Sequence, residues 1–192
     1  MKAYKDFIIS PIGERYNNST KVCEKELILN TEVYNHQYVN RLAKVIATPL
    51  LFSSPINVGD EVIVHHNVFR RWHDVKGREK NSRSYWKEGK YFVTEDQIFL
   101  YNKKATPGFS FVKPLKSNDI FNLEDERPLI GVVKYSDGTF RKEELVGFDP
   151  VSTYEFVIDG ERLYRVMNKF ITIKYEYQGN EEEYNPSWSQ SS

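Results

Sequence analysis

The sequence predicts an all-β protein built from two small, similar units. Short runs of β-branched and aromatic residues alternate with turn residues along the chain, and no long stretch keeps the apolar period of a helix. Several segments of the second half also repeat segments of the first half in the same order, which indicates an internal duplication.

The composition fits a folded protein without a strong charge bias. Hydrophobic residues make up 40% of the 192 residues and aromatic residues 15%, which is enough for packed cores. Lys+Arg and Asp+Glu are both 27, so no bulk nucleic-acid partner is expected. The single cysteine, Cys23, excludes an internal disulfide and fits a reducing compartment. Without an apolar run of signal-peptide or membrane-span length, we expect a cytoplasmic protein.

The first unit is predicted to span residues 1–104. Its first strand, Phe7–Ile12, ends at a proline and a glycine. Residues 14–41 then form a polar loop without Gly or Pro, and its middle holds one apolar island, Leu27-Ile28-Leu29. A loop of this length in a compact domain is usually functional or disordered. The segment His36–Ala43 allows a short helix.

The rest of the first unit alternates predicted strands with polar connections. Val45–Ala47 and Val62–Val64 are predicted strands around a turn-rich segment. Residues 67–90 are charged and aromatic, and we expect them to form an excursion whose hairpin tip lies near Gly77. Two further strands follow in Tyr91–Tyr101.

The second unit, residues 105–176, is predicted to be a shorter copy of the first. Val93 and Ile98 match Val166 and Ile171 at one constant offset (166 − 93 and 171 − 98), whereas the prolines of the two first strands are further apart (114 − 11). The first copy is therefore about 30 residues longer, and we expect the excess in 14–41 and 67–90. The matched segments are Phe7–Ile12 with Phe109–Leu115, Val45-Ile46 with Val132-Val133, Glu61–Val64 with Leu145–Phe148, and Lys90–Tyr101 with Arg162–Tyr175. Residues 177–192 are predicted to be a disordered acidic and polar tail.

The order of these landmarks resembles the GroES co-chaperonins, in particular divergent phage-encoded ones. The resemblance covers about Tyr4–Tyr101 in the first copy and, more weakly, Phe109–Tyr175 in the second. It implies two tandem GroES-like small β-barrels, the first with a long mobile loop. The residues that carry it are Asp6–Pro11, Leu27-Ile28-Leu29, Lys44–Ala47, Val58–Val64 and Tyr91–Tyr101.

The resemblance also implies a function. GroES-like subunits form a seven-membered ring, and each extends a mobile loop whose apolar tripeptide binds a GroEL-type chaperonin. The ring caps the chamber in which a client protein, here by resemblance a phage capsid protein, folds. Leu27, Ile28 and Leu29 match that tripeptide, so they are the predicted chaperonin-binding residues. The resemblance implies no catalytic residue, cofactor or metal, and the second copy, with only 116–128 at the loop position, is not assigned chaperonin binding.

Two departures from the family leave alternatives open. The long roof hairpin of the family is reduced here to Thr48–Asn57, and the glycines that usually flank the tripeptide are absent. The alternative for Leu27–Leu29 is an extra strand packed on the barrel. The alternative function is a structural ring component of a phage, located in the virion, that keeps the barrel without binding a chaperonin. An ordered 14–41 loop would favour that alternative.

Two other clusters are considered and set aside. His65 and His66 are adjacent, and adjacent residues of a strand point to opposite faces, so they are not expected to share a metal with His73 and Asp74. A basic and aromatic patch lies in 67–90 and is typical of a nucleic-acid-binding barrel. The zero net charge and the interleaved acids favour a solvated or subunit-contact loop instead. The residues of the patch are Arg70, Arg71, Trp72, Lys76, Arg78, Lys80 and Arg83.

Overall fold

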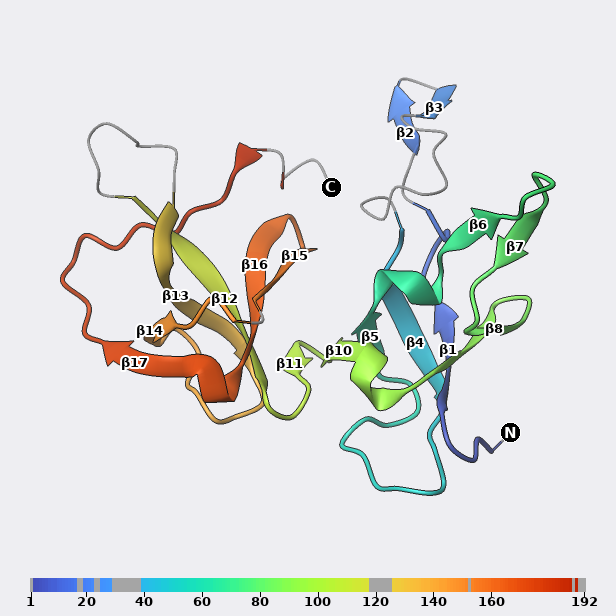
Figure 1. The fold of residues 1–192 in the computed structure, drawn as a ribbon, viewed down its shortest axis with the longest axis horizontal. Helices are drawn as coiled ribbons and strands as arrows, with labels where there is room; N and C mark the ends of the chain where they lie inside the picture. The colour runs from blue at the N-terminus through green and yellow to red at the C-terminus, as the bar shows by residue number, and fades with distance from the viewer. Residues whose placement is uncertain are drawn as a thin grey trace. The chain divides into compact units, whose positions relative to one another are not determined.

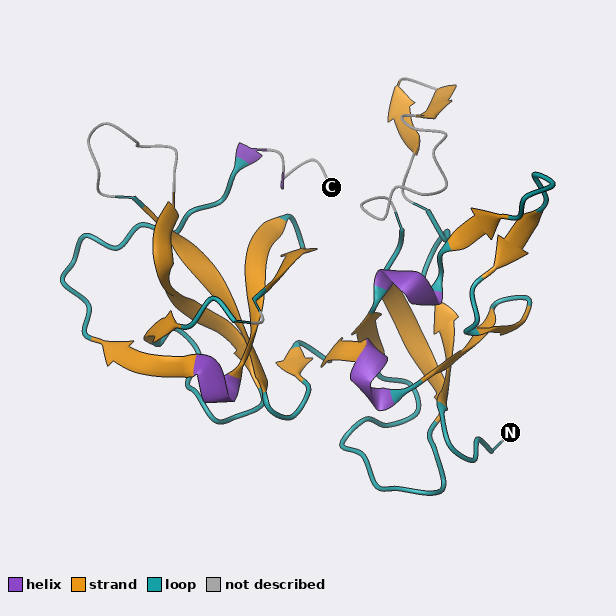
Figure 2. Cartoon of the chain, viewed as in Figure 1, coloured by secondary structure: helices purple, strands orange, loops and turns teal. Residues whose placement is uncertain are grey.

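The computed structural model describes residues 2–16, 19–22, 25–28, 39–117, 126–151, 153–187 and 189. The all-β prediction is confirmed: these residues form antiparallel strand pairs and three-residue 3-10 turns, and no α-helix occurs among them (Figure 2). None of the described helical segments is long and apolar enough to cross a membrane. The chain divides into two compact units, residues 1–102 and 103–192 (Figure 1).

The first unit is built on one large sheet. Within residues 1–102 its strand order is β10-β5-β4-β1-β9-β8. The buried side chains of these strands form one cluster that includes Phe7, Ile9, Val45 and Tyr91. The strands are β1 (Phe7–Pro11), β4 (Leu42–Ala47), β5 (Glu61–Val64), β8 (Tyr85–Lys87), β9 (Lys90–Val93) and β10 (Ile98–Tyr101), with 3-10 turns η2 (His66–Val68) and η3 (Glu95–Gln97). The two-residue strand β11 (Lys104–Ala105) belongs to residues 103–192.

Two small hairpins accompany this sheet. One is formed by β2 (Ser19–Val22) and β3 (Lys25–Ile28), and the other by β6 (Arg71–His73) and β7 (Glu79–Asn81). Both follow the ends of main strands: the first lies between β1 and β4, and the second between β5 and β8. Because Leu42 at the start of β4 pairs with Ile63 near the end of β5, both connections leave the sheet at the same end.

The second unit has a six-stranded sheet in the order β15-β16-β12-β13-β14-β17. Its buried residues include Phe111, Val112, Val133, Val146 and Val166. The strands are β12 (Phe109–Lys116), β13 (Glu126–Ser136), β14 (Leu145–Phe148), β15 (Tyr154–Ile158), β16 (Glu161–Met167) and β17 (Ile171–Tyr175), with the 3-10 turn η4 (Asn168–Phe170) between the last two.

The two sheets share one topology. The order β8-β9-β1-β4-β5-β10 in the first unit corresponds strand by strand to β15-β16-β12-β13-β14-β17 in the second. The bulge between Ile8 and Ile9 opposite β4 recurs between Phe111 and Val112 opposite β13. Shared order, pairing and bulges are what a duplicated β-unit requires. The equivalent pairings are Ile9 with Tyr91 and Val45, and Val112 with Tyr164 and Val133.

The strand pairs also locate the excess residues of the first copy. The residue number in the second unit minus that of its equivalent in the first is 103 at β1, 88 at β4, 84 at β5 and 73 at β9. The first unit therefore has 15 extra residues between β1 and β4 (103 − 88), 4 between β4 and β5 (88 − 84) and 11 between β5 and β9 (84 − 73). The sequence predicted all of the extra residues in the two loops 14–41 and 67–90. The four extra residues in the β4–β5 connection correct that prediction. The register also pairs Val132-Val133 with Lys44-Val45, one position away from the predicted match with Val45-Ile46.

Two further expectations differ from the structure. The sequence predicted two small β-barrels, but in the described residues neither large sheet closes, because no pairing joins β8 to β10 or β15 to β17. A short helix was allowed at His36–Ala43. Residues 36–38 lie outside the described residues, and of the rest Val39 forms a β-bridge with Tyr16 while Leu42 and Ala43 belong to β4. Pairing across the sheet thus overrides the weak local helix preference.

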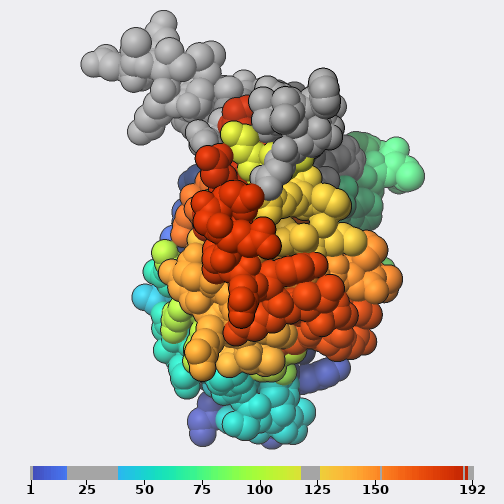
Figure 3. All heavy atoms as spheres, turned by 90° about the vertical axis from the view of Figure 1, so that its left-hand side faces the viewer, coloured from blue at the N-terminus to red at the C-terminus, as the bar shows by residue number. Residues whose placement is uncertain are grey.

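The C-terminal segment packs on the second unit, in contrast to the disorder expected for 177–192. Lys116 N donates to Glu182 O and Tyr184 N donates to Pro114 O, both at 2.8 Å, around a β-bridge between Leu115 and Glu183. Figure 3 shows the red C-terminal part of the chain lying along this unit. Trp188 and residues 190–192 lie outside the described residues.

A cluster of charges explains why this segment stays on the sheet. The Lys113 side chain is only 7% exposed and pairs with Glu161 at 2.6 Å and with Glu183 at 3.2 Å. Glu183 also pairs with Lys134. Burial raises the pKa of Glu183, but hydrogen bonds from Lys134 and Lys113 outweigh it and hold that pKa below its usual range. The acidic tail therefore supplies a counter-charge that a buried lysine needs.

Candidate functional site at the loop-bearing end of the first unit

Two residues of the predicted tripeptide lie in the returning strand of a separate hairpin. Leu27 and Ile28 are the last residues of β3, where they pair with Thr20 and Ser19 of β2. Leu29 lies outside the described residues. In the described part of the chain β3 pairs with β2 and is not a strand of the main sheet. Leu27 and Ile28 thus lie in a strand, but one that pairs with β2, and the pairing does not decide between a partner-binding loop and the alternative of an extra strand packed on the barrel.

The two ends of this loop are held side by side at its base. Tyr16 and Val39 form an antiparallel β-bridge, and Asn40 N donates to Arg15 O at 2.9 Å. Tyr16 and Val39 are both buried and belong to the core cluster of the first unit. The described residues that flank 17–38 are therefore part of the packed core.

Asn40 completes the base of the loop. Its side chain is buried, with the residue only 4% exposed. Nδ2 donates to Ile12 O and to Glu14 O, both at 2.7 Å, and Oδ1 accepts from Leu42 N at 2.9 Å. A side-chain amide offers two donors and an acceptor, and all three functions are used here. One residue thereby ties the chain before the loop to the chain after it.

The loop base is also bound to the β6–β7 hairpin. Arg15 donates from Nε and Nη2 to Phe69 O at 3.2 and 2.8 Å, and from Nη1 to Asn81 Oδ1 at 2.8 Å. Tyr16 Oη accepts from Arg71 N at 2.7 Å, and the Arg71 guanidinium lies 4.8 Å from the centre of the Tyr16 ring. The loop base and the hairpin thus share one anchoring cluster.

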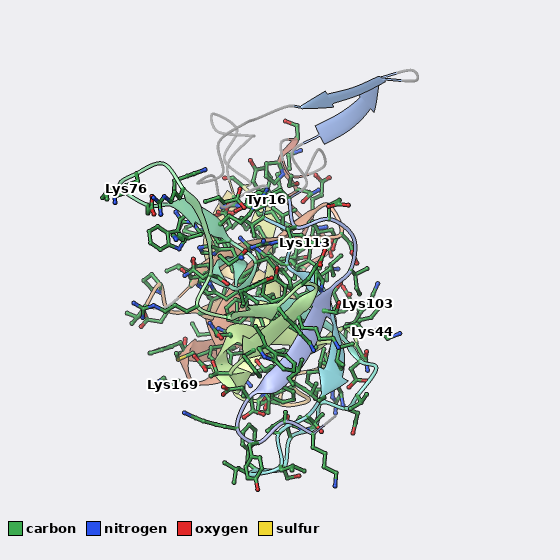
Figure 4. All side chains as sticks on the ribbon, turned by 90° about the vertical axis from the view of Figure 1, so that its right-hand side faces the viewer. Tyr16, Lys44, Lys76, Lys103, Lys113 and Lys169 are labelled. Atoms are coloured by element: carbon green, nitrogen blue, oxygen red, sulfur yellow. The ribbon has the colours of Figure 1, made fainter. Side chains whose placement is uncertain are left out.

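The β6–β7 hairpin and its flanks carry a concentrated positive charge. Residues 67–90 contain eight Lys or Arg and three Asp or Glu, a net charge of +5 (8 − 3) in a chain whose formal net charge is zero. Lys76, Arg78 and Lys80 are exposed. Figure 4 shows Lys76 at the outer end of this hairpin and Tyr16 nearer the body of the unit.

The tip of the hairpin has a fixed turn. Asp74 Oδ1 accepts hydrogen bonds from the backbone N of Lys76 and of Arg78, both at 2.9 Å, and Gly77 takes a φ of 71° that favours glycine. The hydrogen bond from Arg78 contributes most to lowering the pKa of Asp74 below its usual value. Val75 is presented at this tip fully exposed.

The second unit has a much shorter connection at the place where the first carries the hairpin. Twenty residues (65–84) separate β5 from β8, whereas five (149–153) separate β14 from β15. The connection between β12 and β13 includes 118–125, which lie outside the described residues. The hairpin is therefore an addition to a sheet that is complete without it.

The histidine pair is arranged differently from the prediction. The expectation placed His65 and His66 on opposite faces of a strand, but β5 ends at Val64 and His66 begins η2. Their rings lie 4.2 Å apart, and His65 Nδ1 accepts from Asn67 N at 3.1 Å. In the described ranges no group of three or more His, Cys, Asp or Glu side chains is placed to hold a metal. Cys23 lies outside the described residues.

Sequence reasoning missed an apolar surface at the other end of β4. Leu50 and Leu51 are 57% and 65% exposed, and their backbone N atoms donate to Tyr4 O at 3.1 Å. Tyr4 and Val58 are also exposed. The sequence feature that could have predicted this surface is the run Pro49–Phe52, in which apolar residues interrupt a turn-rich segment. The equivalent connection of the second unit, 137–144, is a mostly polar turn.

Comparisons with protein-family models, with curated proteins and with solved structures found no match.

Proposed function

We propose that this chain is a co-chaperonin that binds a GroEL-type chaperonin through Leu27, Ile28 and Leu29 and assists the folding of a client such as a phage capsid protein. The single observation that carries the proposal is the anchored loop. The described residues on the two sides of 17–38 are joined by the Tyr16–Val39 bridge and the Asn40 hydrogen bonds. Leu27 and Ile28 lie in β3, which pairs with β2 and not with the main sheet in the described part of the chain.

The energetics of such a loop suit a cap that must bind and leave. Burying three aliphatic side chains in a partner groove is worth about 1.5–3 kcal/mol each before other terms. Ordering a long loop on binding takes back a large part of that gain. Each loop then binds weakly, and several loops on one ring bind strongly by multivalency. Formation of a ring, seven-membered by resemblance, is therefore part of the proposal, as is the GroES-like nature of the two units.

The second candidate function is a structural ring component of a phage particle. One observation favours it: residues 19–22 and 25–28 pair as strands in the isolated chain. A loop with internal pairing fits a fixed contact between neighbouring subunits as well as a contact formed only on a chaperonin. The decisive difference between the two functions is whether the chaperonin is bound.

The test is a pull-down of the purified protein with a GroEL-type chaperonin, with and without ATP. The first variant replaces Leu27, Ile28 and Leu29 by Ser. The matched control replaces three exposed aliphatic residues at the opposite end of β4, Leu50, Leu51 and Val58, by Ser. We expect nucleotide-dependent binding that is lost in the first variant and kept in the control.

Each other outcome has a definite meaning. Binding that survives the loop variant would retain the co-chaperonin function but reject the tripeptide as its site. Loss in both variants would indicate a general effect of removing apolar surface. If the folded native protein does not bind under either condition, the co-chaperonin proposal is wrong and the structural function becomes the better account.

A further inference from the structure

We propose that the β6–β7 hairpin is a second contact with the partner that binds the tripeptide, and that it meets an acidic surface with a small apolar depression. This inference rests on the proposed function and goes beyond it, because it names a second element of the site and the chemistry of the partner face. The recognition elements are the exposed cations Lys76, Arg78 and Lys80 around the exposed apolar tip Val75.

The first argument is the placement of the hairpin. It leaves the sheet at the same end as the tripeptide loop, since β4 begins and β5 ends there. Arg15 and Tyr16, at the base of that loop, bind Phe69, Asn81 and Arg71 of the excursion directly. A partner that engages the loop therefore faces the end of the unit on which the hairpin is mounted.

The second argument is that the fold does not require this element. The second unit forms the same strand order with five residues where the first has twenty. The exposed part of the hairpin adds little to the core: Trp72 is 47% exposed, and residues 75–81 are all exposed. An exposed element that the sheet can do without is retained for what it contacts.

The third argument is the chemistry of its surface. Two of the four cations of the hairpin have an ion-pair partner: Arg71 pairs with Glu79 at 3.2 Å, and Lys80 lies 3.9 Å from Asp74. Lys76 and Arg78 are exposed and have no ion pair within the described residues. The net charge of +5 over 67–90 (8 − 3) contrasts with the zero net charge of the chain. Such a local charge attracts an acidic surface over about one Debye length and raises the association rate.

The fixed tip explains how the same element gives orientation. Asp74 holds the turn through three hydrogen bonds, two accepted from Lys76 N and Arg78 N and one donated from its own N to Arg78 O. Val75 is thereby presented without a large ordering cost on binding. The apolar island would supply most of the affinity, while the hairpin would raise the association rate and fix the orientation of the chain on its partner.

The test measures association and dissociation rates with an immobilised GroEL-type chaperonin in the presence of ATP, at about 0.05 M and about 0.3 M salt. The test variant is Lys76→Glu, Arg78→Glu, Lys80→Glu. The matched control reverses three exposed lysines elsewhere, Lys2→Glu, Lys104→Glu, Lys142→Glu, so that net charge is the same. A separate Val75→Ser variant tests the apolar tip, and circular dichroism checks that each variant is folded.

We expect the hairpin reversal to slow association by about tenfold or more at low salt, with a smaller effect at high salt, and the control to change it less than about twofold. Val75→Ser should raise the dissociation rate with little effect on association. Equal rates for the native protein and the hairpin reversal at both salt concentrations would overturn the proposal. So would an equal effect of the control, because the charge would then act without regard to position.

Two further outcomes separate this inference from the function on which it rests. If the native protein does not bind the chaperonin, both proposals fail together. If native binding is lost on replacing Leu27, Ile28 and Leu29 but is unaffected by the hairpin reversal, the function stands and the second contact is rejected. The same variants are tested with a fluorescein-labelled oligothymidine. Binding by the native protein that the reversal abolishes would assign the hairpin to single-stranded nucleic acid and overturn the protein contact.

Discussion

Replacing Asn40 by alanine removes the side chain that joins the two ends of the 17–38 loop. Asn40 makes three side-chain hydrogen bonds of 2.7–2.9 Å, to Ile12 O, Glu14 O and Leu42 N, and is only 4% exposed. A protein hydrogen bond contributes about 1 kcal/mol net, and a buried group left without a partner costs about 1–3 kcal/mol. We therefore expect Asn40→Ala to reduce the free energy of unfolding of the first unit by about 2–4 kcal/mol.

Asn40→Asp tests the hydrogen bonds more directly because it keeps the shape of the side chain and replaces its hydrogen-bond donor by an acceptor. The carboxylate can still accept from Leu42 N, but an oxygen now faces Ile12 O and Glu14 O, where Nδ2 donated. Burial and these carbonyls would raise the pKa of the introduced carboxyl in the folded state above about 3.9. A raised carboxyl pKa means that the penalty is full at neutral pH and shrinks as the pH falls through the folded-state pKa.

Urea unfolding followed by tryptophan fluorescence measures both variants. Trp72 and Trp86 lie in the first unit, and a Trp188→Phe background removes the third tryptophan. Asn67→Ala, at an exposed position, is the control and should change stability by less than about 0.5 kcal/mol. The reasoning would be refuted if both Asn40 variants lost no more than the control, or if the Asn40→Asp deficit did not shrink between about pH 7 and about pH 4.

Two predictions concern the second unit. Gly131→Ala should destabilise it by roughly 2–4 kcal/mol in a thermal melt, because an added Cβ would lie 2.4 Å from Lys113 O and 2.6 Å from Val112 Cγ1. The first unit accommodates an alanine, Ala43, at the equivalent position. An unchanged melting temperature would contradict the prediction. Glu183→Gln should release the C-terminal segment at a cost of roughly 1–2 kcal/mol, seen as faster hydrogen exchange at Lys116 N and Tyr184 N. In the native protein the pKa of Glu183 is lowered, so its contribution to stability is present above its unfolded pKa and is lost as the pH falls through its folded-state pKa. The same two amides should therefore lose protection from hydrogen exchange in acid. Protection at Lys116 N and Tyr184 N that changes neither with the substitution nor with the pH would contradict the ion-pair account.

The sequence predicted the strands best where local chemistry fixes the spacing. The offset between Val93 and Val166 is kept between Ile98 and Ile171, since the 3-10 turns Glu95–Gln97 and Asn168–Phe170 occupy the same place in the two units. In the first of these turns, Thr94 and Gln97 form a capping box. A turn of constant length keeps the strands on either side in register. The alternation of apolar and polar residues then identifies those strands in the sequence.

The one-position error at β13 has a different cause. Val45-Ile46 and Val132-Val133 are both apolar pairs, so their letters match equally well in either register. The hydrogen bonds decide: Gly59 N donates to Val45 O, and Glu143 N donates to Val133 O. Gly59 and Glu143 both adopt a positive φ, 95° and 64°. A glutamate at a position that favours glycine hides the equivalence from the sequence.

The charged contacts could not be predicted from local sequence at all. Lys113 stands in the mostly apolar segment Phe109–Leu115, and a lysine there indicates that a counter-charge lies nearby. Its partners, Glu161 and Glu183, lie on distant parts of the chain, in β16 and in the C-terminal segment. The same holds for Arg15, whose acceptors on Phe69 and Asn81 become neighbours only through the fold.

The duplication gives the assignment of the site a physical basis that neither unit provides alone. Two sheets with the same order and the same bulges show which residues the shared fold needs. The first unit is longer than the second in three connections, as the falling offsets between paired strands show. The largest two additions leave the sheet at one end, and Arg15, Tyr16 and Arg71 bind the base of one to the other. The shorter copy forms the same sheet, so the sheet itself does not require these additions, and it is on this basis that we propose contact with a partner for them.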